Sequence, residues 1–181
     1  TLPYVEAWYE KDKEAGLVVL GVHTPEFDFE KVLGNVEAAV KKFGITYPIV
    51  LDSDYGTWGA YENQYWPHEY LIDIDGFIAD DHIGEGDYAE TEMDIQKLLA
   101  ERNAALGLST PIPAGTVNPT ATPINDSMPL SPETYLGSAR NGGDASHTKG
   151  AWRIMPEYAE TSSVGAKLLY EYEAQNVYLV A

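Results

Sequence analysis

Amphipathic patterns alternate with short apolar runs along the first hundred residues. Val5, Trp8 and Tyr9 recur at helical spacing and predict a helix at the start of the chain. Gly16 is a residue type that commonly ends such a helix. Residues 17–22 are apolar at almost every position. They therefore predict a strand buried on both faces, which is typical of a central parallel strand.

A second helix and two shorter elements follow. Apolar positions from Phe29 to Phe43 recur at i, i+3, i+4 and i+7, so they predict an amphipathic helix that ends at Gly44. Residues 47–51 predict a short strand, and residues 58–61 predict a short helical turn.

A hairpin and a last helix complete this part of the pattern. Residues 69–72 and 77–83 predict two strands, and the Asp-Gly pair at residues 75–76 supplies the positive φ that a tight hairpin turn needs. Ile95 and Leu99 mark a final helix.

The order helix, strand, helix, strand, strand, helix predicts an α/β fold. A strand–helix–strand crossover is right-handed by rule, and the hairpin adds an antiparallel edge. With one more strand ahead of Thr1, this is the layout of a thioredoxin-like domain. We assign residues 1–103 to that domain, which lacks its N-terminal strand in this chain.

The second half of the chain has a different character. Residues 104–130 are rich in Pro, Thr, Ser and Asn and are interpreted as an extended linker. Residues 131–181 predict an incomplete β segment, with strands at 167–172 and 177–180 joined by a turn at 174–176. Few strands in about fifty residues rarely form a stable domain. We expect this segment to pack on the first domain or on a second copy, since strand edges seek partners.

Composition narrows the classes of function. The formal net charge of -18 argues against nucleic acid as a partner, because such proteins carry a basic face. The chain has no cysteine, so these residues hold no disulfide, no thiolate metal site and no thiol nucleophile. No apolar run approaches the ~18 residues of a membrane span. We expect neither a metal nor a cofactor.

Several stretches carry a resemblance to a known family. Residues 20–26, 47–52 and 66–76 resemble the periplasmic thioredoxin-like reductases of cytochrome c maturation. More narrowly, the chain is similar to the soluble C-terminal region of the DipZ family. That similarity is carried by residues 1–5, 21–27, 84–88 and 132–137.

The resemblance implies a parent protein with three parts. DipZ-family members have a membrane portion, a thioredoxin-like domain and a β module resembling a carbohydrate-binding jelly roll. Their Cys-x-x-Cys motif lies just ahead of the Thr-Leu-Pro found here at residues 1–3. We therefore expect the chain to begin inside a longer parent, with the cysteine pair, the first strand and any membrane anchor upstream. Residues 131–181 would be the start of the jelly roll.

Pro67 is the main candidate site residue. In thioredoxin folds a cis-proline before the penultimate strand forms a wall of the substrate groove, and Pro67 stands at that place. The alternative is an ordinary proline at a strand entry. Trp66 and His68 flank it as candidate groove residues, although Trp66 could equally cap the core.

Glu26 and His23, in and just before the loop after the first strand, are further candidate site residues. Related reductases place a glutamate near their cysteines at the position of Glu26, where a carboxylate in a partly apolar pocket could exchange protons with a thiol. The alternative is a loop residue that helps to start the next helix. His23 could tune a thiolate, but a hydrogen-bonded histidine at a strand end is the commoner case.

The function expected from the resemblance is thiol–disulfide exchange outside the cytoplasm of a bacterium, with a thiol or disulfide protein as substrate. One alternative is a peroxiredoxin-like antioxidant domain, which shares the fold. Another is a non-catalytic module that binds cell-wall carbohydrate or protein. Four aromatic side chains within residues 131–181 could stack on sugars, or they could fill the core of a β-sandwich: Trp152, Tyr170, Tyr172 and Tyr178.

Overall fold

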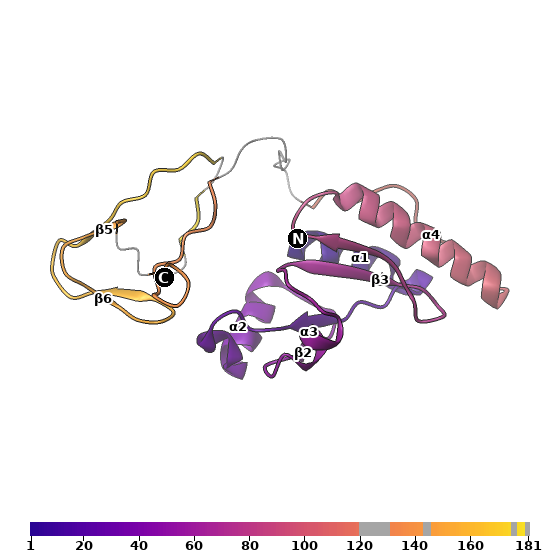
Figure 1. The fold of residues 1–181 in the computed structure, drawn as a ribbon. Coiled ribbons are helices and arrows are strands. Elements are labelled where there is room, and N and C mark those ends of the chain that lie inside the picture. The colour runs from indigo at the N-terminus through magenta and orange to yellow at the C-terminus, as the bar shows by residue number, and fades with distance from the viewer. Residues whose placement is uncertain (120–130, 143–145, 175–176, 180–181) are drawn as a thin grey trace. The chain divides into compact units, whose positions relative to one another are not determined.

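The structure is a computed structural model that describes residues 1–119, 131–142, 146–174 and 177–179. It divides into two compact units, Thr1–Ile124 and Asn125–Ala181, which are treated separately (Figure 1). The division falls inside the predicted linker, residues 104–130, of which residues 120–130 lie outside the described part.

The first unit contains the elements that the apolar pattern predicts, in the predicted order. Its helices are α1 (Leu2–Asp12), α2 (Leu33–Phe43), α3 (Gly56–Ala60) and α4 (Tyr88–Leu106), with 3₁₀ turns η1 (Lys13–Ala15) and η2 (Asp28–Lys31). Its strands are β1 (Gly21–His23), β2 (Ile49–Leu51), β3 (His68–Ile72) and β4 (Ile78–Ile83).

α1 begins and ends where its sequence allows. Pro3 lies in the first turn, where a missing N–H costs no intrahelical hydrogen bond. The helix closes through η1 at Gly16, whose φ of 112° favours glycine. A Cβ at this position would lie 2.7 Å from the Arg102 guanidinium carbon on α4, so glycine also permits close contact between the helices.

The strands of the first unit form two separate pairs within its described residues. β1 and β2 are parallel, with Gly21 opposite Ile49 and His23 opposite Leu51. β3 and β4 form an antiparallel hairpin, with a register shift between Leu71 and Ile72. The parallel pair and the hairpin share no ladder, so the described residues of the first unit form two half-sheets rather than one sheet.

The prediction of a fully buried strand over residues 17–22 is wrong. Only Gly21–His23 is a strand, and Val18 and Leu20 are 85% and 56% exposed. The reason is that β1 has a ladder partner on one side only, within the described residues. The apolar run preceding β1 therefore faces an open groove rather than a neighbouring strand.

The core of the first unit lies between α1, α4 and β3. Trp8, Ala15, Tyr88, Ile95 and Leu99 form its buried cluster. Figure 1 shows α1 and α4 beside the β3–β4 hairpin. Partly buried side chains complete this core, and two of them come from the predicted linker: Tyr4, Val5, Leu17, Leu71, Ile112 and Val117.

The second predicted helix is divided in two. η2 and α2 are separated by Val32, which has an extended conformation with φ −79° and ψ 111°. The Glu30 carboxylate accepts the backbone N–H groups of Glu26 and Phe27 at 2.6 and 3.1 Å, which stabilises the start of a separate turn. α2 ends at Gly44, as predicted.

The second unit is composed of short strands. β5 (Thr148–Lys149) pairs with β8 (Lys167–Leu168), and β6 (Trp152–Ile154) pairs with β7 (Ala159–Thr161), both antiparallel. The strand predicted over residues 167–172 is thus limited to its first two residues. Residues 177–179 are not in a strand, and two residues of the predicted turn, Gln175 and Asn176, lie outside the described part.

Candidate functional site

A groove of about 550 Å³ separates β1 from β3 in the first unit. We call it the β1–β3 groove. Its walls come from the N-terminal end of α1, the run before β1, the loop before β3 and β3 itself. No backbone–backbone hydrogen bond involves residues 18–20 in the described structure. The lining includes Thr1, Val18, Leu20, Trp66, Pro67 and Glu69.

The predicted proline loop forms one wall of this groove. The Trp66–Pro67 peptide bond is cis, as predicted. The Trp66 indole N–H donates to the carbonyl of Thr24 at 3.1 Å, and its ring centroid lies 4.1 Å from that of Trp58. The Tyr55 hydroxyl donates to the carbonyl of Pro25. These contacts join the proline loop, α3 and the loop after β1.

Asp52 supports this wall and was missed by sequence reasoning. Its carboxylate accepts the backbone N–H groups of Thr57 and Trp58 at 2.9 and 2.8 Å, and the Thr24 hydroxyl at 3.2 Å. The two backbone N–H donors hold the pKa of Asp52 below its ordinary value. The available signal was an acidic side chain a few residues ahead of a short helix.

His68 lines the groove with both ring nitrogens engaged. Its Nε2 lies 2.7 Å from the Asp81 carboxylate, and its Nδ1 lies 2.8 Å from the Asn63 side-chain oxygen. The Tyr70 hydroxyl also lies 2.8 Å from Nδ1. His68 thus connects the loop before the proline to the hairpin, and its role toward a substrate stays a prediction.

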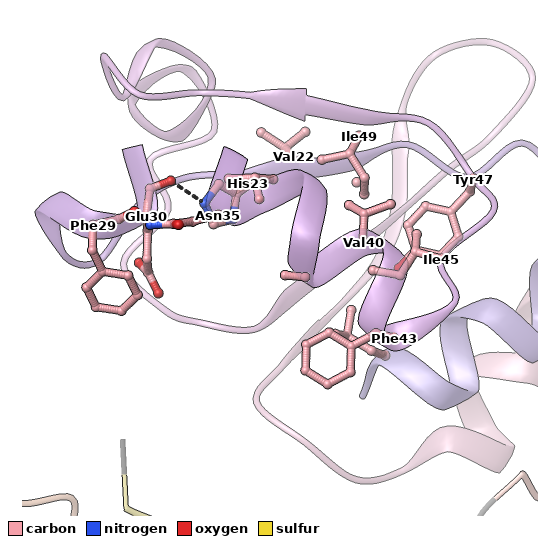
Figure 2. Close-up of a pocket in the computed structure, with 14 residues that line it drawn as sticks. Val22, His23, Phe29, Glu30, Asn35, Val40, Phe43, Ile45, Tyr47 and Ile49 are labelled. Atoms are coloured by element: carbon pink, nitrogen blue, oxygen red, sulfur yellow. Dashed lines mark hydrogen bonds between the residues drawn. The ribbon is translucent and has the colours of Figure 1, made fainter. Parts of the chain in front are cut away.

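The structure places His23 away from this groove. His23 lines a second groove of about 430 Å³, between α2 and the β1–β2 pair (Figure 2). Its Nε2 lies 3.1 Å from the carbonyl of Glu30, the arrangement weighed as the commoner alternative. Apolar side chains of α2 and β2, including Val40, Phe43 and Ile49, also line this second groove.

Glu26 follows two residues whose carbonyl groups accept hydrogen bonds from other elements. Thr24 accepts from Trp66 of the proline loop, and Pro25 accepts from Tyr55 at the start of α3. The backbone N–H of Glu26 donates to Glu30, so part of its environment is the start of η2. Its proposed exchange of protons with a thiol stays a prediction.

Glu69 is a second residue that sequence reasoning missed. Both of its carboxylate oxygens are buried and have no hydrogen-bond partner within the described residues. Burial raises the pKa of Glu69, and His82 opposes that shift. The signal in the sequence was a carboxylate in an otherwise apolar strand directly after the proline loop.

The chemistry available in the described residues is binding and proton transfer. They contain no group of three or more His, Asp or Glu side chains placed to hold a metal ion. None of their helices has the length and apolar character needed to cross a membrane. The whole chain lacks a thiol.

Comparison with known proteins identifies what the chain is similar to. No family model matches it. DipZ of Mycobacterium tuberculosis and DipZ of Mycobacterium bovis are each 38% identical over 201 residues, covering 99% of this chain and 28% of each relative. Thiol-disulfide oxidoreductase YkuV of Bacillus subtilis is 29% identical over 100 residues, covering 55% of this chain and 67% of that protein.

A solved structure agrees with these relatives. The solution structure of a thioredoxin-like protein in the oxidized form matches with a TM-score of 0.51 and 29% identity, covering 55% of this chain and 67% of that chain. The predicted fold class and family resemblance are therefore confirmed, and the first unit is an incomplete redoxin domain. The chain spans little more than a quarter of the DipZ proteins, at 28% of their length.

Proposed function

We propose that this chain, a thioredoxin-like region of the DipZ type, provides the substrate groove for thiol–disulfide exchange in a longer protein. The observation that carries the proposal is the proline loop, whose Trp66–Pro67 bond is cis and which lies next to the N-terminal end of α1. The carbonyl of Pro67 accepts the N–H of Gly84, and the adjacent Glu85 accepts the Thr1 hydroxyl at 3.5 Å.

The N-terminal end of α1 and the proline loop suit two parts of the reaction. A helix N-terminus favours a thiolate over a thiol, because the helix dipole stabilises negative charge there. A cysteine pair directly ahead of Thr1 would benefit from that field. The proline loop, with the half-exposed ring of Trp66, presents an apolar surface to the backbone of a thiol or disulfide protein substrate.

The proposed location is the bacterial cell envelope, outside the cytoplasm. The support is the resemblance of residues 20–26, 47–52 and 66–76 to periplasmic reductases of cytochrome c maturation. Attachment to a membrane would come from a part of the parent outside this chain.

The test measures reduction of a disulfide-containing protein by the full-length protein. Trp66→Ala should lower kcat/KM by about 10-fold, since it removes a groove wall anchored to Thr24 and Trp58. The control is Tyr158→Ala, an exposed aromatic in the second unit. Equal losses in both variants, or no exchange in the full-length protein, would contradict the proposal. Rapid reaction of a single upstream cysteine with peroxide would favour the peroxiredoxin-like alternative.

Exposed aromatic side chains favour a second function, in binding, for the second unit. Tyr172 and Tyr178 are 52% and 86% exposed, and the rings of Tyr170 and Tyr172 are nearly parallel. We propose that they bind cell-wall polysaccharide, because flat aromatic faces stack on sugar rings. Pull-down with insoluble polysaccharides should retain the full-length protein and lose it on Tyr172→Ala. Absence of binding across a broad glycan panel would remove this function.

A further inference from the structure

The histidine that follows the proline loop is held from two sides. His68 is the first residue of β3, and its side chain is only 8% exposed. Its Nε2 lies 2.7 Å from a carboxylate oxygen of Asp81 on β4. Its Nδ1 lies 2.8 Å from the side-chain oxygen of Asn63, in the loop ahead of the proline. These partners belong to the hairpin and to that loop, so the contacts are independent of any strand ahead of Thr1.

The orientation of the Asn63 side chain is fixed by the backbone that follows it. The backbone N–H groups of Gln64 and Tyr65 donate to the side-chain oxygen of Asn63 at 2.8 and 3.2 Å. The side-chain nitrogen of Asn63 donates to the carbonyl of Tyr65 at 3.2 Å. Because a backbone N–H can only donate, the Asn63 atom that faces His68 is the oxygen. The Nδ1 atom of His68 therefore carries a hydrogen and donates it.

The other ring nitrogen also faces an acceptor, so His68 and Asp81 share one additional proton. A neutral imidazole has a single N–H, which Nδ1 already uses, and an ionised carboxylate can only accept. The 2.7 Å contact between Nε2 and the Asp81 carboxylate thus requires a proton on one of its two atoms. With that proton the contact is a charge-assisted hydrogen bond, which is stronger than a bond between neutral groups.

Tyrosine side chains complete the surroundings of this proton. The hydroxyl of Tyr70 on β3 lies 2.8 Å from Nδ1 of His68. Burial raises the pKa of Tyr70, with Asp81 and Tyr61 adding to the shift, so Tyr70 stays a neutral hydroxyl where a histidine titrates. The ring of Tyr65 packs against His68 edge-on, with its centroid 6.4 Å away. Asp81 is therefore the charged group that decides whether the proton stays.

The loop that His68 holds includes a strained residue. Glu62 has a φ of 51°, a conformation that residues other than glycine rarely adopt. Such a conformation persists only where surrounding contacts enforce it. Asn63, the next residue, supplies those contacts through the loop backbone and His68, and the loop then continues into Trp66 and Pro67. The position of the proline loop thus depends on the contact between His68 and β4.

We propose that His68 is a positioning residue, which fixes the loop of Trp66 and Pro67 against β4 as long as it shares a proton with Asp81. The inference rests on the proposed function, in which this loop contacts the backbone of the substrate protein. When the proton leaves, Nε2 and the carboxylate are two acceptors that face each other, and their contact is lost. The proline loop then loosens, so binding of the disulfide substrate weakens as pH rises.

The first test is hydrogen exchange of residues 62–65 in the full-length protein, measured by mass spectrometry. After correction for the intrinsic exchange rate, protection in the wild type should fall about 10-fold between about pH 6 and about pH 8.5, because a charge-assisted hydrogen bond is lost. Asp81→Asn should keep equal protection at both pH values, since its amide donates to Nε2 without the additional proton. The matched control is Asp80→Asn, an exposed carboxylate on the other face of the hairpin, which should behave as the wild type.

The second test is the kinetics of disulfide reduction by the same full-length proteins. His68→Ala should raise KM for a disulfide-containing protein about 10-fold at about pH 6 and change kcat less than about 2-fold, because the loop binds the substrate and takes no part in the chemistry. The rise of KM with pH in the wild type should be absent from Asp81→Asn.

The results that would overturn the inference differ from those that would overturn the proposed function. Protection that falls equally with pH in the wild type and in Asp81→Asn would remove the shared proton. Protection of residues 62–65 that is unchanged in His68→Ala would remove the positioning role. A full-length protein without disulfide-exchange activity would remove the proposed function and the effect on substrate binding. Hydrogen exchange would still decide in that protein whether His68 and Asp81 hold the loop.

Discussion

Buried carboxylates in the first unit differ in the donors that surround them. Asp52 accepts two backbone N–H groups, so its charged form is stabilised. Asp12 is completely buried, and neither of its carboxylate oxygens has a hydrogen-bond partner within the described residues. Burial raises the pKa of Asp12, with Lys11 opposing and Glu92 adding to the shift. The charge of Asp12 therefore destabilises the fold, whereas that of Asp52 stabilises it.

Asp12→Asn should stabilise the chain at high pH. A raised folded-state pKa means that the native state binds more protons, so stability falls as pH rises from the ordinary Asp value of 3.8 through the folded pKa. The variant does not lose stability in this way. We expect its free energy of unfolding to exceed that of the wild type by about 1 kcal/mol at pH 8, and this difference disappears near pH 3. Urea denaturation at both pH values measures it. Asp54→Asn, a substitution of an exposed carboxylate, serves as the control. An equal gain in stability at both pH values would contradict the claim that the charge of Asp12 destabilises the fold.

The elements themselves were largely predictable from apolar periodicity. α1, α4 and the β3–β4 hairpin follow from local patterns and turn residues such as Gly16 and Gly76. The run before β1 was misread because periodicity shows that residues are apolar, not which neighbour covers them. The break at Val32 depends on the side chain of Glu30, and periodicity does not report such caps.

The site was predictable only in part, for a related reason. The position of Pro67 ahead of a strand identified the proline loop. Glu69 and Asp52 were missed because their significance depends on burial and on hydrogen bonds to residues of other elements. His23 was placed near the candidate site, but its side chain lines the opposite side of β1.

Asp52→Ala should loosen α3 and the wall behind Trp66. It removes the acceptor for the N–H groups of Thr57 and Trp58, so we expect Tm to fall by about 5 °C at neutral pH. Because the folded pKa is lowered, this contribution is present above the ordinary value of 3.8 and is lost as pH falls through the folded pKa. Calorimetry at pH 7 and pH 2.5 tests this. A loss that is equally large at pH 2.5 would contradict it.

Across the first unit, a buried ion pair attaches the segment after α4 to the rest of the unit. Lys11 on α1 lies 2.6 Å from the fully buried carboxylate of Glu92 on α4. The other oxygen of Glu92 accepts the backbone N–H of Val117 at 2.7 Å. The Lys11 ammonium and the Gln96 side chain both donate to the carbonyl of Gly115. Part of the predicted linker is thus integral to the first unit.

Lys11→Met should destabilise the first unit strongly. It leaves the Glu92 carboxylate buried without its cation, which costs about 3 kcal/mol in the free energy of unfolding. Urea denaturation of the chain measures the effect. Lys13→Met, which removes a solvent-exposed pair with Glu10, should leave the midpoint unchanged. Similar effects of the two substitutions would show that the buried pair has no special role.

For the whole protein, the central claim is that a cysteine pair next to Thr1 works beside the loop of Trp66 and Pro67. The most direct measurement is the intact mass of the full-length protein after alkylation, with and without prior reduction, followed by peptide mapping. We predict two cysteines directly ahead of Thr1 that are alkylated only after reduction. A full-length protein with no cysteine at that place would contradict the claim.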